Sequence, residues 1–168
     1  MMIQIRSEEL GDFEAVHNIN EAAFGRPEEA NLVDALRAGG AATISLVALE
    51  GAACVGHVLF SPVMLDTDHG AVEGIGLAPL AVLPAHQRTG IGNKLVCEGL
   101  NRCRQQGHTF AVVLGDPAYY TRFGFVPARH FGIRCEYDVP EDAFMVMELQ
   151  PDALRNRTGL VRYRKEFS

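Results

Sequence analysis

The sequence predicts an α+β fold in which helices cover a mixed β-sheet. Alternating or continuously apolar segments of strand length are interspersed with segments whose apolar residues recur at helical spacing. Turn residues, mostly glycine and proline, separate these segments. The chain has 168 residues, of which 48% are hydrophobic and 21% are charged. Its size and composition are those of one globular domain, which we expect to span residues 1–168.

The first half of the sequence predicts two helices between strands. Strands are expected at Met2–Arg6, Ile44–Leu49, Cys54–Leu65 and from about Val72 to Leu83. The first helix follows Ser7, a candidate N-cap, and its residues near helical spacing are Phe13, Val16, Ile19, Asn20, Ala23 and Phe24. Gly25-Arg26-Pro27 ends this helix, and a second spans Glu28–Arg37. The stretch from Asp66 to Gly70 is predicted to be a hairpin loop.

The second half predicts one long helix and several short elements. The long helix runs from Gly92 to about Gln106, and Gly107 ends it. Phe110–Leu114 is continuously apolar, which is typical of a strand covered on both faces. Asp116-Pro117 favours the start of a brief helix that Gly124 stops. Two or three more strands follow, most clearly at Phe144–Leu149 and Leu160–Tyr163.

Composition excludes several classes of protein. No apolar run approaches the ~18 residues that span a bilayer, so no membrane segment is expected. Met1–Arg6 leads directly into acidic residues and does not resemble a signal peptide, which predicts a cytoplasmic protein. The four cysteines have no metal-ligand spacing and predict reduced, mostly buried thiols and no metal site. A formal net charge of -6 argues against nucleic acid as the main partner.

One segment, residues 74–94, combines features that point to an anion site. It begins as an apolar strand, yet Pro79 cannot donate to a ladder and implies a bulge or an unpaired edge. The strand leads into Gln87-Arg88-Thr89-Gly90-Ile91-Gly92, which opens the long helix. Backbone N–H groups at a helix N-terminus bind anions, and Arg88 and Lys94 lie beside them. The segment matches neither the Walker loop nor the dinucleotide fingerprint.

These residues resemble the central signature of the GNAT superfamily of acetyl-coenzyme A-dependent N-acetyltransferases. The signature Q/R-x-x-G-x-G/A stands here as Gln87 to Gly92, after an apolar strand that ends Leu80-Ala81-Val82. The family also often carries a tyrosine five residues before a Gly-Phe phenylalanine, as in Tyr120 to Phe125. That stretch, with Asp142-Ala143-Phe144-Met145 downstream, is most similar to the YhbS-like branch. The resemblance covers nearly the whole chain.

The resemblance implies a fold and a coenzyme site. The expected fold is a three-layer αβα arrangement with a mixed, mostly antiparallel sheet that splays between its fourth and fifth strands. The pantetheine arm of acetyl-coenzyme A (acetyl-CoA) would lie in the splay and the pyrophosphate on the glycine loop. The coenzyme-binding residues are then expected to be Leu80, Ala81, Val82, Gln87, Arg88, Thr89, Gly90, Ile91, Gly92, Asn93 and Lys94.

The resemblance also implies a catalytic set. Tyr120 stands where the family's proton donor stands, and it would act as the general acid toward the departing thiolate. Two residues are candidates for the general base, His57 and Glu73. Glu73 lies nine residues before Val82, about 30 Å of extended strand, which is far from the expected thioester. His57 has a side chain suited to base catalysis near neutral pH, although a single histidine on a strand is more often structural.

The leading function is therefore direct transfer of an acetyl group from acetyl-CoA to a primary amine, with a homodimer as the default assembly of the family. An alternative of another class is a non-catalytic acyl-CoA-binding sensor or regulatory module, and a third is a domain whose glycine loop binds another phosphate ligand.

From His86 to His108 positive charges outnumber negative ones by three, which leaves a formal charge of -9 for the rest of a chain of net charge -6. This distribution permits a basic coenzyme site on an acidic surface, and an acidic surface would favour a cationic amine acceptor.

Overall fold

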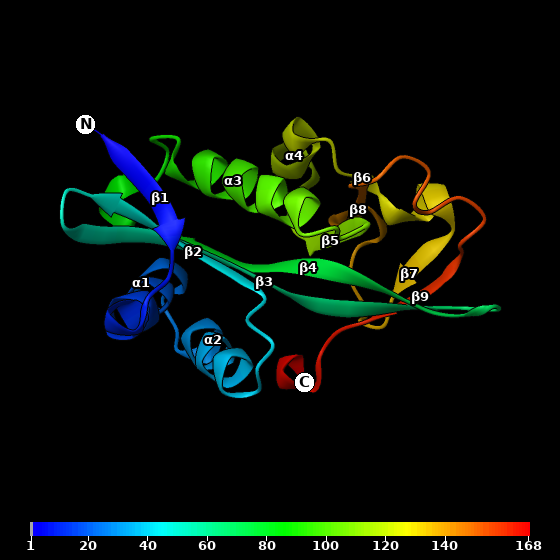
Figure 1. Cartoon of the computed structure of the whole chain (residues 1–168), viewed down its shortest axis with the longest axis horizontal. Coiled ribbons are helices and arrows are strands. Elements are labelled where there is room, and N and C mark those ends of the chain that lie inside the picture. Colours follow the sequence, from blue (N-terminus) through cyan, green and yellow to red (C-terminus); the bar gives the residue numbers. More distant parts are fainter. Residues whose placement is uncertain (1) are drawn as a thin grey trace. The chain divides into compact units, whose positions relative to one another are not determined.

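The computed structural model describes residues 2–168 (Figure 1). The strands are β1 (Ile3–Ser7), β2 (Ile44–Glu50), β3 (Ala53–Thr67), β4 (Gly70–Val82), β5 (Phe110–Leu114), β6 (Val126–Pro127), β7 (Ile133–Cys135), β8 (Phe144–Glu148) and β9 (Gly159–Arg162). They hydrogen-bond in the order β1-β2-β3-β4-β5-β8-β6, and β9 pairs with both β3 and β7. Among the registers described, β4–β5 and β7–β9 are parallel and the others antiparallel. The predicted mixed, mostly antiparallel sheet is confirmed.

The chain divides into two compact units, each described here by itself. The first unit comprises the described residues up to Ser61 together with residues 78–102, and the second comprises residues 62–77 and 103–168. The strands β3 and β4 and the end of α3 (Ile91–Gln105) pass from one unit to the other. The expectation of one domain over residues 1–168 stays a prediction.

Helices cover both faces of the strands in the first unit. The helices α1 (Phe13–Phe24) and α2 (Glu28–Ala38) lie on one side, and α3 lies on the other (Figure 1). The inward residues of α1 and α2 recur at helical spacing, and Val16, Val33 and Leu36 are fully buried. This arrangement confirms helices on both faces of the strands.

Two glycines let α3 lie close to β3. A Cβ atom at Gly56 would stand 3.0 Å from Leu95 Cδ1 and 3.2 Å from Ile91 Cγ2 on α3. A Cβ atom at Gly99 would overlap the buried ring of Phe60. This close packing therefore fixes the position of α3, including its first residue Ile91, against β3.

The parallel pairing of β4 with β5 is short. It joins Ile75, Gly76 and Leu77 to Ala111, Val112 and Val113, and it ends there. Pro79 follows two residues later within β4, after a cis Ala78-Pro79 peptide bond, and has no N–H to donate. The alternative of an unpaired edge thus fits better than a bulge at this position, because β4 runs on to Val82 beyond the end of its ladder with β5. The expected splay between the fourth and fifth strands is confirmed.

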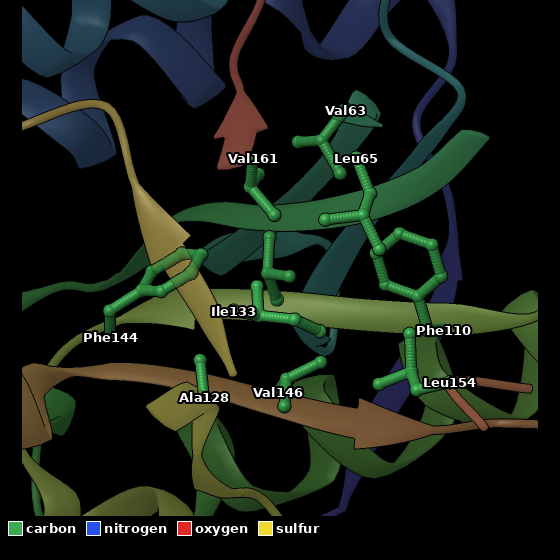
Figure 2. Packing of buried hydrophobic residues seen from close by; sticks show 10 residues of the cluster. Val63, Leu65, Phe110, Ala128, Ile133, Phe144, Val146, Leu154 and Val161 are labelled. Atoms are coloured by element: carbon green, nitrogen blue, oxygen red, sulfur yellow. The ribbon is translucent and has the colours of Figure 1, made fainter. Parts of the chain in front are cut away.

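The core of the second unit is built where short strands meet (Figure 2). Its buried cluster consists of Val63, Leu65, Phe110, Val112, Ala128, Ile133, Phe144, Val146, Leu154 and Val161. Gly74 lies directly against the ring of Phe110, so a side chain at this position would displace the ring. The remaining elements are α4 (Pro117–Tyr120) and the 3-10 turns η1 (Leu10–Asp12), η2 (Pro84–His86), η3 (Thr121–Phe123), η4 (Ala128–Phe131), η5 (Glu141–Ala143) and η6 (Lys165–Phe167).

Local expectations were wrong at three places. Ser7 is the last residue of β1, opposite Leu46, and the following turn is capped by Glu9 and Asp12 instead. The hairpin loop is only Asp68-His69, because pairing of Asp66 with Leu160 keeps β3 extended. Two further short strands, β6 and β7, precede Phe144 and depend on pairing with β8 and β9 for their existence.

The cysteines are more accessible than predicted. Only Cys103 is buried, whereas Cys54 and Cys135 are half-buried and Cys97 is exposed, and all four are free thiols.

Among residues 2–168, no helix is long and apolar enough to cross a membrane. The same residues contain no group of three or more side chains arranged to hold a metal ion.

The contact between α3 and β3 gives a stability prediction. Gly99→Ala should lower the free energy of unfolding by about 1–3 kcal/mol, because the added methyl overpacks against Phe60. Urea unfolding followed by circular dichroism measures the change. Gly11→Ala is the control, because its Cβ would meet nothing within 4 Å, and it should leave stability unchanged or raise it by up to about 1 kcal/mol. A gain in stability at Gly99, as expected for an open helical site, would contradict the close packing.

Candidate functional site

The loop between β4 and α3 has the backbone of an anion-binding turn. Its chain reverses through two left-handed residues, Arg88 with φ 63° and Gly90 with φ 90°. Left-handed residues alternating with right-handed or extended ones turn successive N–H groups toward the same side, which forms a concave anion site. Glycine adopts this conformation freely, but arginine does so at a cost. The loop therefore holds Arg88 in a backbone conformation that a side chain disfavours.

Two polar side chains hold the loop in shape from within. Gln87 Nε2 donates to the carbonyl oxygen of Val82 at 3.0 Å, and Thr89 Oγ1 donates to the carbonyl oxygen of His86 at 2.6 Å. The N–H of Leu83 donates to Val55 on β3 at 2.9 Å, which fixes the start of the loop. The side chains of Gln87 and Thr89 thus hydrogen-bond within the loop. The Gln87 N–H donates to the Pro84 carbonyl at 3.4 Å, so the backbone N–H of Thr89 is the one of the two that is better suited to a ligand.

The N-terminus of α3 adds further donors. The carbonyl of Gly90 accepts from Lys94 N at 3.1 Å, which makes Gly90 the N-cap of the helix. The N–H groups of the first helical residues, Ile91 and Gly92, have no acceptor within a helix, and the helix dipole makes this end positive. Ile91 is 2% exposed and anchors the turn in the core. Rigid donors at a positive helix end suit a phosphate group.

Two cations beside the loop are available to a ligand. Arg88 and Lys94 are exposed, and neither makes an ion pair with any residue from 2 to 168. Farther along α3, by contrast, Arg102 is paired with Glu98 at 3.0 Å and donates to Ser7. Within the part of α3 that belongs to the first unit, the positive charge without an ion pair therefore lies next to the glycine turn.

The end of β4 supplies the predicted strand edge. Residues from Ala78 to Val82 extend beyond the ladder with β5, and they belong to the first unit, as the loop does. Ala81 and Val82 are buried and Leu80 is half-buried. The structure thus brings Leu80, Ala81 and Val82 together with Gln87 to Lys94 in one continuous segment.

Tyr120 lies in the second unit, in an aromatic cluster on α4. Asp116 caps this helix by accepting from the N–H of Ala118, and Pro117 occupies its first position, as predicted. The ring of Tyr120 makes edge contacts with Tyr119 and Phe125 and lies against Gly115. Its hydroxyl has no hydrogen-bond partner among the described residues. Burial, and secondarily the neighbouring Tyr119, raise the pKa of the phenol well above its usual value. The phenol therefore stays protonated.

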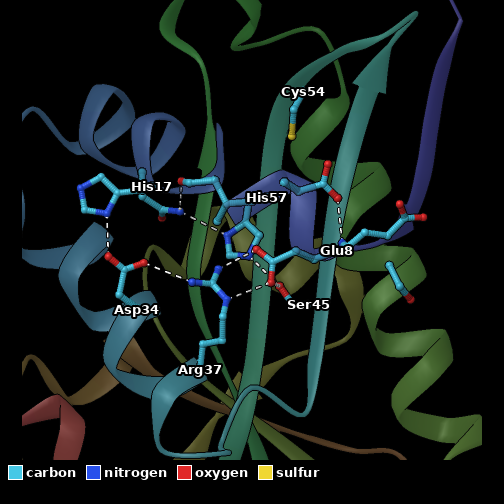
Figure 3. A network of polar contacts seen from close by, with 12 residues as sticks. Glu8, His17, Asp34, Arg37, Ser45, Cys54 and His57 are labelled. Carbon is cyan, nitrogen blue, oxygen red and sulfur yellow. Dashed lines mark hydrogen bonds and ion pairs between the residues drawn. The ribbon is translucent and has the colours of Figure 1, made fainter. Parts of the chain in front are cut away.

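His57 lies at the centre of a buried polar network in the first unit (Figure 3). Asn20 Nδ2 lies 3.2 Å from His57 Nδ1, and His57 Nε2 lies 2.9 Å from Ser45 Oγ. Because Asn20 Nδ2 is a donor, Nδ1 is the acceptor and Nε2 carries the proton toward Ser45. The Ser45 hydroxyl then donates to Glu8 Oε1 at 3.1 Å. Both ring nitrogens of His57 are thus engaged with protein groups.

The network continues to the surface through Arg37. Arg37 is paired with Glu8 at 2.7 Å and with Asp34 at 3.1 Å, and its guanidinium lies 3.8 Å above the ring of Phe13. Asp34 is in turn paired with His17 at 2.8 Å. Burial, together with the positive charge of Arg37, lowers the pKa of His57 to about 3. A fully buried, neutral imidazole with both nitrogens engaged is a structural residue in this conformation and is poorly placed to accept a proton from a substrate.

The other candidate base, Glu73, is exposed on β4 in the second unit. No ion pair to Glu73 is present among residues 2–168. No sequence pattern predicted the hydrogen-bond partners of His57, Asn20 and Ser45, or the continuation of the network to Glu8 and Arg37. One signal was visible, because Asn20 falls on the apolar face of its helix, where an unpaired amide would be costly.

Comparison with known proteins agrees with this geometry. Residues 4–128 match the model of an acetyltransferase (GNAT) domain family. The chain is 39% identical to the uncharacterized N-acetyltransferase YhbS of Escherichia coli K12, over 98% of both chains. The crystal structure of E. coli YhbS in complex with CoA superimposes with a TM-score of 0.92, covering 98% of this chain and 91% of that one. A GNAT family acetyltransferase from Brucella melitensis, crystallised with acetyl-CoA, gives a TM-score of 0.82 at 37% identity and covers 99% of each chain.

Burial of His57 makes folding sensitive to acid. The folded-state pKa of about 3 lies below the unfolded value near 6.5, so the unfolded chain binds an additional proton between these pH values. The stability contributed by neutral His57 is complete above pH 6.5 and is lost as the pH falls toward 3, with a slope approaching about 1.4 kcal/mol per pH unit. His57→Gln should remove this slope, as measured by urea unfolding at pH 7, 6 and 5. His69→Gln, in the exposed hairpin turn, should keep it, and an unchanged slope in His57→Gln would contradict the assignment.

Proposed function

Because the chain belongs to the GNAT family of acetyltransferases, we propose that it transfers the acetyl group of acetyl-CoA directly to a primary amine of a small molecule, a peptide or a protein. The observation that carries this proposal is the loop from Gln87 to Lys94, whose left-handed residues, helix N-terminus and two unpaired cations suit a pyrophosphate. The E. coli and Brucella relatives, which crystallised with CoA and acetyl-CoA, support the same ligand.

The residues present fit this ligand in distinct ways. The backbone N–H groups from Gln87 to Gly92 bind the pyrophosphate, and Arg88 and Lys94 add charge-assisted contacts to phosphate oxygens. The backbone of Leu80 and Val82 binds the pantetheine amides, because β4 has left its ladder with β5 at this point. The Val82 carbonyl already accepts from Gln87 and has one further lone pair for a ligand.

The chemistry forms a C–N bond and breaks a C–S bond. The neutral amine nitrogen attacks the thioester carbon, and a backbone N–H in the splay stabilises the resulting oxyanion. The attacking nitrogen then loses one proton to solvent water as the C–S bond breaks and the CoA thiolate departs. Tyr120 donates to that thiolate. Its raised pKa makes complete proton transfer to a thiolate uphill, so the phenol acts chiefly as a hydrogen-bond donor that stabilises the departing sulfur.

The amine must lose its proton before it attacks. His57 is sealed in the network with Asn20 and Ser45, and Glu73 stands nine residues before Val82 on the strand. We therefore assign the deprotonation to solvent water and give neither residue a direct catalytic role. The absence of a well-placed base among the two candidates is also the observation that favours the second function, a non-catalytic acyl-CoA-binding module.

Release of free thiol from acetyl-CoA separates the two functions. Purified protein is incubated with acetyl-CoA and a panel of amines comprising an aminoglycoside, a polyamine, a free amino acid, a peptide N-terminus and a lysine peptide. Amine-dependent thiol release, with the acetylated amine found by mass spectrometry, is the expected result. Tight CoA binding with no release for any amine would favour the sensor module, and preference for ATP or NAD would contradict both.

Arg88 should show opposite effects on folding and binding. Arg88→Gly relieves a left-handed side chain, so the free energy of unfolding should stay the same or rise by up to about 1 kcal/mol. The dissociation constant for CoA should rise about tenfold, because a charged contact to phosphate is lost. Calorimetry and urea unfolding measure the two effects. Asn156→Gly is the matched control at φ 58°, and it should leave CoA affinity unchanged. Unaltered affinity in Arg88→Gly would remove Arg88 from the site.

Tyr120 should affect turnover more than binding. Tyr120→Phe should lower kcat by about 100-fold, because the thiolate loses its donor, and should change KM for acetyl-CoA less than twofold. The neighbouring Tyr119→Phe is the control, since it removes a phenol from the same helix and should keep most of the activity. Equal rates for Tyr120→Phe and the wild type would exclude Tyr120 as the donor.

A further inference from the structure

A contact between two side chains connects the turn before the loop from Gln87 to Lys94 with the strand β2. His86 Nε2 lies 3.1 Å from Glu50 Oε2, and the two residues come from the last turn before the loop and from the end of β2. We propose that Glu50 and His86 are positioning residues that set the loop for the pyrophosphate of CoA. This inference rests on the proposed function, since it concerns the same coenzyme site.

His86 stands directly before the loop, and its backbone connects the pair to the left-handed turn. The His86 N–H donates to Leu83 O at 2.8 Å, and the His86 carbonyl accepts from Thr89 Oγ1. The residue therefore joins the first turn of the loop to the second, and Arg88 and Gly90 follow within four residues. Within residues 2–168, the Gln87 side chain bonds back to β4, whereas the His86 side chain contacts Glu50 on β2. A shift of His86 would move the carbonyl oxygen that accepts from Thr89 Oγ1. The left-handed turn at Arg88 and Gly90 would shift with it.

The imidazole of His86 depends on this contact for its orientation. Its Nδ1 atom is buried and has no hydrogen-bond partner within residues 2–168, so Nε2 makes the ring's polar interaction. The Glu50 Oε2 atom is likewise buried and has no hydrogen bond of good geometry, which leaves the contact with His86 Nε2 as its polar contact among residues 2–168. Each of the two groups thus lacks a second protein partner that could replace the first.

A positioning role differs from a purely electrostatic one and from a purely structural one. The side chains are 25% and 37% exposed, and pairs with this exposure contribute little to stability. The charge of Glu50 would by itself repel a phosphate, so removing the charge alone should not weaken CoA binding. Removing the contact should weaken CoA binding, because His86 then loses the side-chain contact that positions it before the loop. Two substitutions at Glu50 therefore separate charge from position.

The test compares Glu50→Ala with Glu50→Gln, whose amide can keep a polar contact with His86 Nε2 without the charge. Glu50→Ala should raise the dissociation constant for CoA and the KM for acetyl-CoA about fivefold, with kcat unchanged, whereas Glu50→Gln should stay within twofold of the wild type. S-acetylpantetheine, which lacks the pyrophosphate, should be used equally well by all three proteins. Glu98→Ala is the matched control, because Glu98 is 39% exposed and forms a comparable pair with Arg102 on α3, and it should leave all these values unchanged.

The outcomes are distinguishable. Melting temperatures should agree within about 3 °C, and if Glu50→Ala unfolds, His86→Phe carries the same comparison between the two thioesters. The inference is overturned if wild type and Glu50→Ala bind CoA equally, if Glu50→Ala and Glu50→Gln change affinity alike, or if S-acetylpantetheine shows the same loss as acetyl-CoA. Failure of the wild-type protein to bind CoA would overturn the proposed function instead.

Discussion

A neutral imidazole buried among polar partners is the interaction on which the first unit depends. His57 on β3 joins Asn20 on α1 to Ser45 on β2, and through Ser45 it reaches Glu8 and Arg37. Polar groups in a core destabilise it unless each finds a partner of correct geometry. The network therefore admits one register of β2 against β3 and one placement of α1, and apolar packing alone would specify both less strictly.

The cations of the same unit differ in whether they are paired with a carboxylate. Most of its arginines are paired with carboxylates, as Arg6 is with Asp12, Arg26 with Glu29 and Arg37 with Glu8. Arg88 and Lys94 are exceptions, and both stand at the glycine turn where the helix dipole is positive. An acidic protein thereby keeps a local basic site in its first unit, because the other arginines of that unit are paired with carboxylates and the two cations at the turn are not.

Sequence reasoning succeeded where a local pattern has one physical solution. Gly90 at the head of an amphipathic segment predicted the turn and, within one residue, the start of α3. It failed where pairing decides the outcome. Ser7 has the chemistry of an N-cap but pairs with Leu46 in β1, and β6 is only two residues long and exists through its pairing with β8. Such pairings depend on contacts with segments far along the chain, which local propensity does not describe.

The sequence by itself determined the family resemblance and the glycine turn before α3, because glycine spacing, an apolar strand and adjacent cations are local features that act through backbone geometry. Only the tertiary structure decided the roles of the side chains that meet across the fold. It placed His57 in the core, where desolvation keeps it neutral, and it brought Glu50 beside His86 at the foot of the loop. Burial and the partner of a charged group are set by residues distant in sequence, so no pattern along the chain reports them.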